Sequence, residues 1–298
     1  MTEINSVSCP WLGLQSYGAI DADRFFGRRA VLAVVDAQLR SSGVGGVVGA
    51  SGSGKSSLLV AGLASVGWSP VVCRPAPDPI AALAAAESRW RQDPAGESAV
   101  LVIDQLEEVF AINDDALRVE FFDRVVALAA GPTPVALGLR SDRYGDCAAY
   151  PEFAAILSRG HVLVPAPDDA DLAEMIVGPA RHAGVEVAPD VVAIAIDDVD
   201  GEPGALPLLS HALATTWQRR SSQRIELDDY LASGGVHGSI ATAGEAVWSA
   251  LDPELESPAR RILTDLADPT SANLDIGRKL RVVDVALDGD EPARDALD

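Results

Sequence analysis

Lysine is nearly absent from this sequence. Of its 23 basic residues only Lys55 and Lys279 are lysines, and 44 aspartates and glutamates bring the formal net charge to −21. A surface so acidic repels nucleic-acid phosphates and anionic lipids, which disfavours a general nucleic-acid or membrane-surface binder. Residues 1–100 hold eight acids and eight bases, whereas residues 101–298 hold 36 acids and 15 bases. An anionic ligand therefore meets less repulsion in the first third of the chain.

Cysteine and long apolar runs are also scarce. Cys9, Cys73 and Cys147 are odd in number and far apart, which argues against a disulfide framework or a zinc site and predicts reduced thiols in the cytoplasm. No apolar run reaches the roughly 18 residues of a membrane span, and the N-terminus lacks a signal-peptide core. With 48% hydrophobic and 22% charged residues, the chain is predicted to be globular, with no membrane partner.

Short Val/Leu/Ile runs alternate with helical patterns as far as residue 165. The runs predict five strands, at 44–48, 71–74, 99–103, 135–139 and 161–164. The stretches between them predict helices at 28–40, 55–66, 80–91, 116–129 and 143–157. This alternation is typical of an α/β fold in which helices cover a parallel sheet.

After residue 165 the alternation stops. Residues 166–235 predict helices only, at 170–182, 190–198, 205–219 and 227–231. Residues 236–298 predict helices at 242–251 and 258–266, a strand-like run at 280–287 and an acidic tail. We therefore expect boundaries that divide the chain into 1–27, 28–165, 166–235 and 236–298.

One loop fits the pattern G-x-x-x-x-G-K-[ST] of phosphate-binding loops. Its residues are Gly49, Ala50, Ser51, Gly52, Ser53, Gly54, Lys55 and Ser56, with Ser57 directly after them. The glycines let backbone N–H groups surround phosphate oxygens, Lys55 reaches the β- and γ-phosphates, and Ser56 ligates Mg²⁺. The loop follows a predicted strand and opens a predicted helix, so we expect ATP or ADP with Mg²⁺ here rather than a flexible turn.

A carboxylate for the metal follows the third predicted strand. Parallel topology brings Asp104 to the same sheet edge as the loop, where it would hold Mg²⁺, the alternative being a turn residue or helix cap. Glu107 and Glu108 come next, and one of them is expected to polarise an attacking water. We favour Glu108, with Glu107 as the competitor. One extra strand between loop and acid is typical of the additional-strand class of P-loop ATPases.

Arg140 ends the fourth predicted strand. If that strand lies beside the strand of Asp104, the guanidinium points towards the γ-phosphate and could distinguish ATP from ADP. A surface ion pair with Asp142 or Asp146 explains the same residue equally well.

Two further motifs also have both a binding and a structural interpretation. Phe25 and Phe26 precede Gly27 and could wall an adenine, although local evidence favours a hydrophobic staple at a helix start. Pro207 lies in the first turn of the predicted helix 205–219, which is ordinary helix-start chemistry. The functional interpretation is a lid helix whose first turn touches the nucleotide.

The motifs together resemble the novel STAND NTPase family, a bacterial branch of the signal-transduction ATPases related to AAA+, NACHT and NB-ARC proteins. The resemblance covers residues 9–298. It is carried by CPWLGLQSY at 9–17, DADRFFGRR at 21–29, GASGSGKSSLL at 49–59, VLVIDQLEEVF at 100–110, LGLRSDRYGDCA at 137–148 and GEPGALPLLSHAL at 201–213.

The resemblance implies a P-loop core with strand order 5-1-4-3-2, a helical lid, a winged helix and an ATP-dependent switch. It implies that residues 1–27 contribute to the nucleotide pocket and that Phe26, Gly27 and Arg28 lie at the adenine. It also implies that Arg140 is a sensor and Pro207 a lid contact. Protein partners are expected, and a nucleotide-dependent homo-oligomer is compatible with the family.

The chain departs from the usual family architecture. Such proteins usually carry an N-terminal effector and a C-terminal sensor array, and here no histidine follows His237 to close a winged helix over ADP. We therefore expect either a fragment of a longer regulator or a reduced member.

Three functions are compatible with these patterns. The first is an ATP-binding switch with slow Mg²⁺-dependent hydrolysis, in which the nucleotide changes the angle between core and lid. The second is a scaffold stabilised by ADP or ATP that barely hydrolyses it. The third, a DNA-binding regulator, is disfavoured because residues 251–298 carry twelve acids and six bases.

Overall fold

A computed structural model describes residues 8–93, 95, 98–199, 204–220 and 222–266. The chain forms two compact units, Met1–Ile240 and Ala241–Asp298. The centre of the first unit is a parallel sheet of order β2-β3-β4-β1-β5. Its strands are β1 (Val44–Gly49), β2 (Ser69–Cys73), β3 (Ala99–Ile103), β4 (Val135–Arg140) and β5 (His161–Leu163). The predicted order 5-1-4-3-2 is confirmed.

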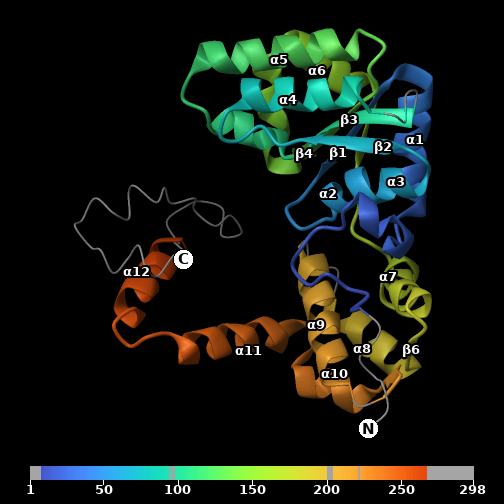
Figure 1. The fold of residues 1–298 in the computed structure, drawn as a ribbon, viewed down its shortest axis with the longest axis vertical. Coiled ribbons are helices and arrows are strands. Elements are labelled where there is room, and N and C mark those ends of the chain that lie inside the picture. Colours follow the sequence, from blue (N-terminus) through green and yellow to red (C-terminus); the bar gives the residue numbers. More distant parts are fainter. Residues whose placement is uncertain (1–7, 94, 96–97, 200–203, 221, 267–298) are drawn as a thin grey trace. The chain divides into compact units, whose positions relative to one another are not determined.

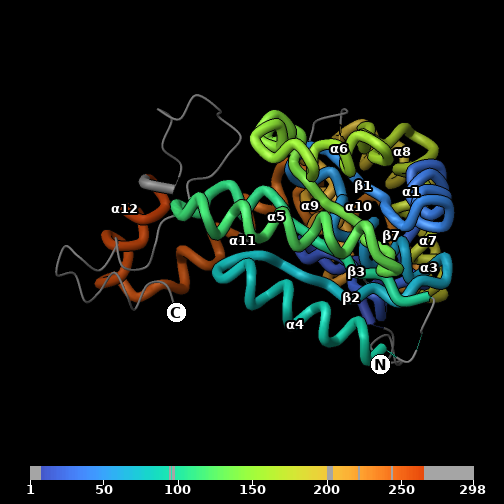
Figure 2. The backbone as a smooth tube through the Cα atoms, turned by 90° about the horizontal axis from the view of Figure 1, so that it is seen from above, coloured from blue at the N-terminus to red at the C-terminus, as the bar shows by residue number. Residues whose placement is uncertain are grey.

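Alternate residues of the central strands pack into different hydrophobic layers. In β3, Leu101 and Ile103 face the layer of α4 (Pro79–Arg91), α5 (Asp115–Ala129) and α6 (Pro151–Arg159). Val100 and Val102 face the layer of α1 (Arg29–Ser42) and of the helix after the phosphate loop. Figure 1 shows α4, α5 and α6 together on one side of the sheet, and Figure 2 shows α4 and α5 side by side. A strand buried on both faces needs apolar residues at every position, as the sequence has.

The helix after the phosphate loop changes its winding in its second turn. It runs through α2 (Lys55–Ser57), a π-helical turn η2 (Leu58–Gly62) and α3 (Leu63–Ser65). A Cβ added to Gly62 would lie 3.0 Å from the Phe25 ring, so this turn packs directly against the chain before α1. Such π-helical turns are frequent at functional sites.

One predicted helix of the core is two elements. Residues 143–157 were expected as a single helix, but the chain forms a 3-10 helix η5 (Ser141–Ala149) and then α6. Pro151 is the cause, because proline has no N–H to donate and its ring clashes with the preceding turn, whereas it is well suited to a first helical position.

The chain after the sheet folds around a separate hydrophobic cluster. Its helices are α7 (Asp169–His182), α8 (Pro189–Val199), α9 (Ala205–Arg219) and α10 (Leu227–Ser233). The expectation of helices only was wrong, since β6 (Glu186–Val187) and β7 (Arg224–Ile225) form a parallel pair. The pair arises because Gly184 turns the chain in a left-handed conformation and the Ala188 N–H then donates to the Ile225 carbonyl at 3.0 Å.

The last described elements are α11 (Gly235–Ala250) and, within the second unit, α12 (Glu256–Leu266). α11 begins earlier than the predicted 242, because Gly234 ends α10 in a left-handed conformation and Asp198 accepts a hydrogen bond from the Val236 N–H at 3.3 Å. The predicted strand at 280–287 and the acidic tail lie outside the described residues. None of the helices in the described ranges is long and apolar enough to cross a membrane.

Candidate nucleotide-binding site

The phosphate loop lies between β1 and α2 at the carboxyl end of the sheet. Gly52 and Gly54 have φ of +71° and +86°, a left-handed region that favours glycine. The Lys55 ammonium is buried across the loop and donates to the carbonyls of Gly49 at 2.9 Å and Ala50 at 2.6 Å. Burial lowers the Lys55 pKa, and the carboxylate of Glu107 opposes that shift.

Asp104 is buried beside the loop with one oxygen satisfied. The Ser56 hydroxyl donates to its Oδ1 at 3.0 Å, and the Gln105 N–H reaches the same oxygen at 3.1 Å. Oδ2 has no hydrogen-bond donor among the described residues, although the Arg74 Nε lies 3.7 Å away. Asp104 is 1% exposed, so its charge is almost entirely removed from bulk water. Such a carboxylate is costly unless a cation compensates it.

Glu107 is the acid that contacts the neighbouring strand β4, and its charge also interacts electrostatically with Lys55. Gln105, in a left-handed conformation at φ +58°, turns the chain from β3 into the 3-10 helix η4 (Leu106–Ala111). The Glu107 carboxylate then accepts a hydrogen bond from the Arg140 N–H at 3.2 Å. Burial raises the Glu107 pKa, against the opposing effects of backbone hydrogen bonds, Lys55 and Arg140.

The Arg140 guanidinium forms a bidentate ion pair with Asp142. Nε and Nη2 donate to the two carboxylate oxygens, each at 3.0 Å, and this pair is the main cause that raises the Arg140 pKa. Asp146 pairs with Arg143 instead, at 2.8 Å. Strand β4 lies between β3 and β1, so Arg140 ends a strand that lies beside the strand of Asp104. Of the two interpretations that the sequence left open, the ion pair with Asp142 is present, and the sensor role stays a prediction.

A cavity of about 210 Å³ opens beside the loop. Its walls come from residues 11–17, from Phe25, Phe26 and Arg28, from the loop, and from α7 and α9. Pro207 also lines it, so the structure brings this residue together with Lys55 and Phe26. The walls are largely apolar, which suits a base and ribose better than the phosphates alone.

Two residues lie directly before α1, and the second of them, Arg28, lines this cavity. Arg28 is buried and donates from Nη1 to the Pro165 carbonyl at 2.9 Å and from Nη2 to the Ser53 carbonyl at 3.2 Å. Burial lowers the Arg28 pKa, with Asp171 and Asp168 opposing the shift. Gly27 has φ of +73°, and a Cβ there would lie 2.3 Å from the Asp171 carbonyl oxygen.

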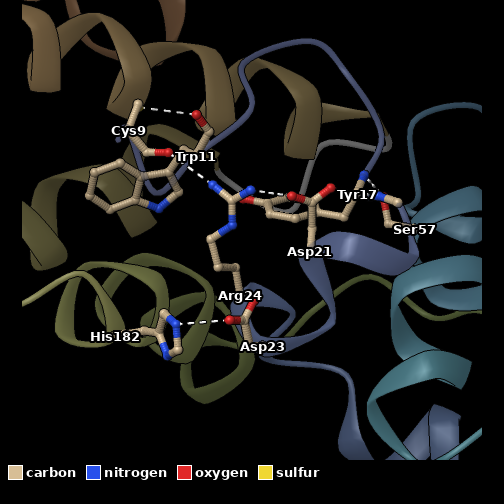
Figure 3. Close-up of polar contacts among 9 residues, drawn as sticks. Cys9, Trp11, Tyr17, Asp21, Asp23, Arg24, Ser57 and His182 are labelled. Carbon is tan, nitrogen blue, oxygen red and sulfur yellow. Dashed lines mark hydrogen bonds and ion pairs between the residues drawn. The ribbon is translucent and has the colours of Figure 1, made fainter. Parts of the chain in front are cut away.

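The N-terminal segment, residues 9–24, joins the sheet region to the helical region across the cavity (Figure 3). The Tyr17 N–H donates to the Ser57 Oγ at 3.1 Å, on the phosphate-loop helix. At the other end Trp11 is buried, its Nε1 donates to the Met175 carbonyl at 3.3 Å, and its ring meets Trp217 edge-on at 6.2 Å. The sequence motif at 9–17 was the only signal for these contacts.

The start of α9 touches the phosphate loop backbone to backbone. A Cβ added to Gly52 would lie 2.7 Å from the Gly204 Cα and 3.0 Å from its carbonyl oxygen. Gly204 itself has φ of +91° and caps α9. Residues 201–203, including Pro203, lie outside the described residues.

A family model described as Novel STAND NTPase 1 matches residues 10–298. The chain belongs to this family. No curated protein matches the sequence well enough to count as a relative. The STAND assignment agrees with the motifs at 9–17 and 49–59 and with the observed strand order.

Solved structures similar to this STAND NTPase are P-loop ATPases. The Orc1 protein of Aeropyrum pernix, solved in complex with DNA, has a TM-score of 0.53 at 16% identity, over 85% of this chain and 75% of that one. The Orc2 protein of the same organism has a TM-score of 0.52 at 14% sequence identity, and the match covers 89% of this chain and 84% of that one. The RuvB Holliday junction branch migration motor of Thermotoga maritima has a TM-score of 0.50 at 15% sequence identity, and the match covers 81% of this chain and 77% of that one. At these identities the likeness shows the fold.

The donor set of this STAND NTPase fits a magnesium ion. Ser56 supplies a hydroxyl and Asp104 a buried carboxylate whose Oδ2 has no hydrogen bond within the described residues. The described part of the chain contains no cluster of three His, Cys, Asp or Glu side chains that could hold a metal alone. One carboxylate and one hydroxyl, completed by phosphate oxygens and water, is the arrangement typical of Mg²⁺ rather than of zinc.

Proposed function

We propose that this chain is a nucleotide-dependent signalling switch that binds ATP and hydrolyses it slowly with Mg²⁺. The observation that carries the proposal is the backbone contact between Gly52 of the phosphate loop and Gly204 at the start of α9. A phosphate that shifts the loop would displace the lid helix, because neither partner has a side chain that could absorb the movement. Protein partners would read the resulting angle between core and lid.

In this proposal each residue of the site has a separate role. Lys55 and the loop amides would hold the phosphates, while Ser56 and Asp104 would hold Mg²⁺. The metal, when bound, would neutralise charge on the phosphate oxygens. Phe26, Gly27 and Arg28 would form the base end of the pocket, and Pro207 would report closure of the lid. The cysteines in the described ranges are free thiols, which supports a cytoplasmic setting.

Glu107 is our candidate for the water-orienting base, although sequence reasoning favoured Glu108. Its carboxylate lies within electrostatic reach of Lys55, and burial raises its pKa, which makes it a better proton acceptor. We expect Glu107→Gln to lower phosphate release about a hundredfold or more while ADP still binds. Glu108→Gln is the matched control. If Glu108→Gln alone abolishes release, the assignment is wrong.

Nucleotide binding itself is tested by thermal shift. ATP or ADP with Mg²⁺ should raise the melting temperature of the purified chain, and Lys55→Ala should remove that rise without lowering the melting temperature of the nucleotide-free protein by a similar amount. Arg91→Ala, an exposed arginine paired with Glu87 on α4, serves as the control for loss of a positive charge. An unchanged shift in Lys55→Ala would contradict phosphate binding at this loop.

A scaffold that holds ADP and barely hydrolyses ATP is the second candidate. The bidentate ion pair with Asp142 favours the scaffold, because that pair engages the Arg140 guanidinium that would otherwise face a γ-phosphate. Phosphate release below detection beside tight ADP binding would favour the scaffold. Either reading is compatible with a nucleotide-dependent homo-oligomer, which light scattering with ADP or ATP would reveal. The net charge of −21 argues against a DNA-binding regulator.

A further inference from the structure

Arg74 occupies a position that the proposed function does not use. It directly follows β2, the strand at the edge of the sheet next to β3. Its Nε lies 3.7 Å from the Asp104 Oδ2, the oxygen that no hydrogen-bond donor in the described part of the chain reaches. The Asp104 side chain is 2% exposed, whereas the Arg74 side chain is 57% exposed. An exposed surface cation therefore lies beside a buried anion.

We propose that Arg74 is the resident counterion of Asp104 and competes with Mg²⁺ for this carboxylate. In the metal-free protein the guanidinium lies nearest to the buried Asp104 Oδ2, which accepts no hydrogen bond within the described residues, and adds to the electrostatic attraction of Lys55. When Mg²⁺ arrives with a nucleotide, the metal takes over that role and Arg74 is released towards solvent. Arg74 thereby sets how much Mg²⁺ the switch needs.

The geometry favours a counterion over a permanent structural pair. At 3.7 Å the contact is an ion pair without a hydrogen bond, and the exposed guanidinium can leave without losing a buried partner of its own. It also favours a counterion over a direct phosphate ligand. β3 and β4 separate β2 from β1, which leads into the phosphate loop, so Arg74 starts from the far side of Asp104.

The inference rests on the proposed function for the step in which metal and nucleotide displace Arg74. The counterion role itself can be tested without any nucleotide. In metal-free buffer, Arg74→Ala should lower the melting temperature of the wild-type chain and should leave it unchanged in the Asp104→Asn background. Loss of the effect in that background identifies the interaction, because a purely structural arginine would give the same loss in both backgrounds.

The competition is tested by titrating Mg²⁺ at a fixed concentration of fluorescent ADP. Arg74→Ala should lower the Mg²⁺ concentration at half-saturation by about 1.5- to fivefold, the size expected when a partly exposed ion pair is removed. Arg74→Lys should stay close to wild type, and Arg91→Ala should change nothing.

Two results would overturn the proposal. Equal effects of Arg74→Ala in the two Asp104 backgrounds would show that the pair does not form. A raised Mg²⁺ requirement would show that Arg74 assists the metal or phosphate instead of competing with it. Failure of the proposed function looks different, since either ADP would not bind to any variant or ADP would bind without phosphate release, while the metal-free comparison would still test the ion pair.

Discussion

The contact between the phosphate loop and the start of α9 makes Gly52→Ala an informative perturbation. Gly52 has φ of +71°, and the new Cβ would lie 2.7 Å from the Gly204 Cα, a separation that Cβ atoms essentially never show. The obstructing atom belongs to backbone, so no side chain can rotate away. Either the loop or the lid helix must move.

The loss in the free energy of unfolding caused by Gly52→Ala has two parts, and a matched control separates them. Gly43 has φ of +72° but nothing within 4 Å of its added Cβ, so Gly43→Ala measures the left-handed strain alone, about 1 kcal/mol. Gly52→Ala carries the same strain plus overpacking, which typically costs about 1–3 kcal/mol. We therefore expect Gly52→Ala to lower the free energy of unfolding by about 2–4 kcal/mol.

The assay is urea denaturation of the nucleotide-free protein followed by tryptophan fluorescence, with the free energy of unfolding taken by linear extrapolation. Gly204→Ala should behave in the same direction, because its Cβ would lie 3.2 Å from the Ser51 carbonyl oxygen at a φ of +91°. If Gly52→Ala and Gly43→Ala differ by less than about 0.5 kcal/mol, the loop and the lid are not in contact in solution and the reasoning fails.

Two further predictions concern the walls of the cavity. Burial raises the pKa of Tyr17 to about 12 from the usual 10, so its neutral hydroxyl stabilises the fold below pH 10 and this contribution is lost as the pH rises through 12. The stability of wild type minus that of Tyr17→Phe should therefore fall between pH 10 and 12 in melting experiments, and a constant difference would contradict the burial. Gly178→Ala should lower the free energy of unfolding by about 1–3 kcal/mol, because its Cβ would lie 2.4 Å from the Phe26 ring. Gly238→Ala, a helical glycine with nothing within 4 Å, should be neutral or stabilising in the same denaturation series.

The fold was predictable where local pattern and tertiary environment agree. Strands β1, β3 and β4 are buried along nearly their whole length, so their sequences are continuous apolar runs that can be recognised without a structure. The two-residue strands β6 and β7 have no periodicity to detect, and their pairing depends on the turn at Gly184, 40 residues before the partner strand begins at Arg224. Pro151 was visible in the sequence, but a proline inside a helical pattern either kinks or ends a helix, and only packing decides which.

The residue types of the candidate site could be predicted from the sequence, whereas the contacts that each residue makes were harder to predict. The loop, Asp104 and the acids after it follow from a motif and from parallel topology. The different placements of Glu107 and Glu108 could not be predicted, because they depend on the left-handed turn at Gln105, a conformation that a non-glycine residue seldom adopts. The contact of Trp11 with Trp217 likewise joins residues about 200 positions apart and leaves no trace in local pattern.

Two contacts connect the phosphate loop rigidly to the helical region. Gly52 meets Gly204 through backbone atoms, and the buried Arg28 guanidinium binds the carbonyls of Ser53 in the loop and Pro165 before α7. Both connections lack an exposed, freely rotating side chain, and packed interfaces of this kind shift between discrete arrangements rather than deform gradually. Arg74 and Asp104 form the opposite kind of contact, between an exposed guanidinium and a buried carboxylate. In the proposed switch both kinds would have a use, because the exposed pair would respond to the metal while the rigid contacts would transmit that response to α9.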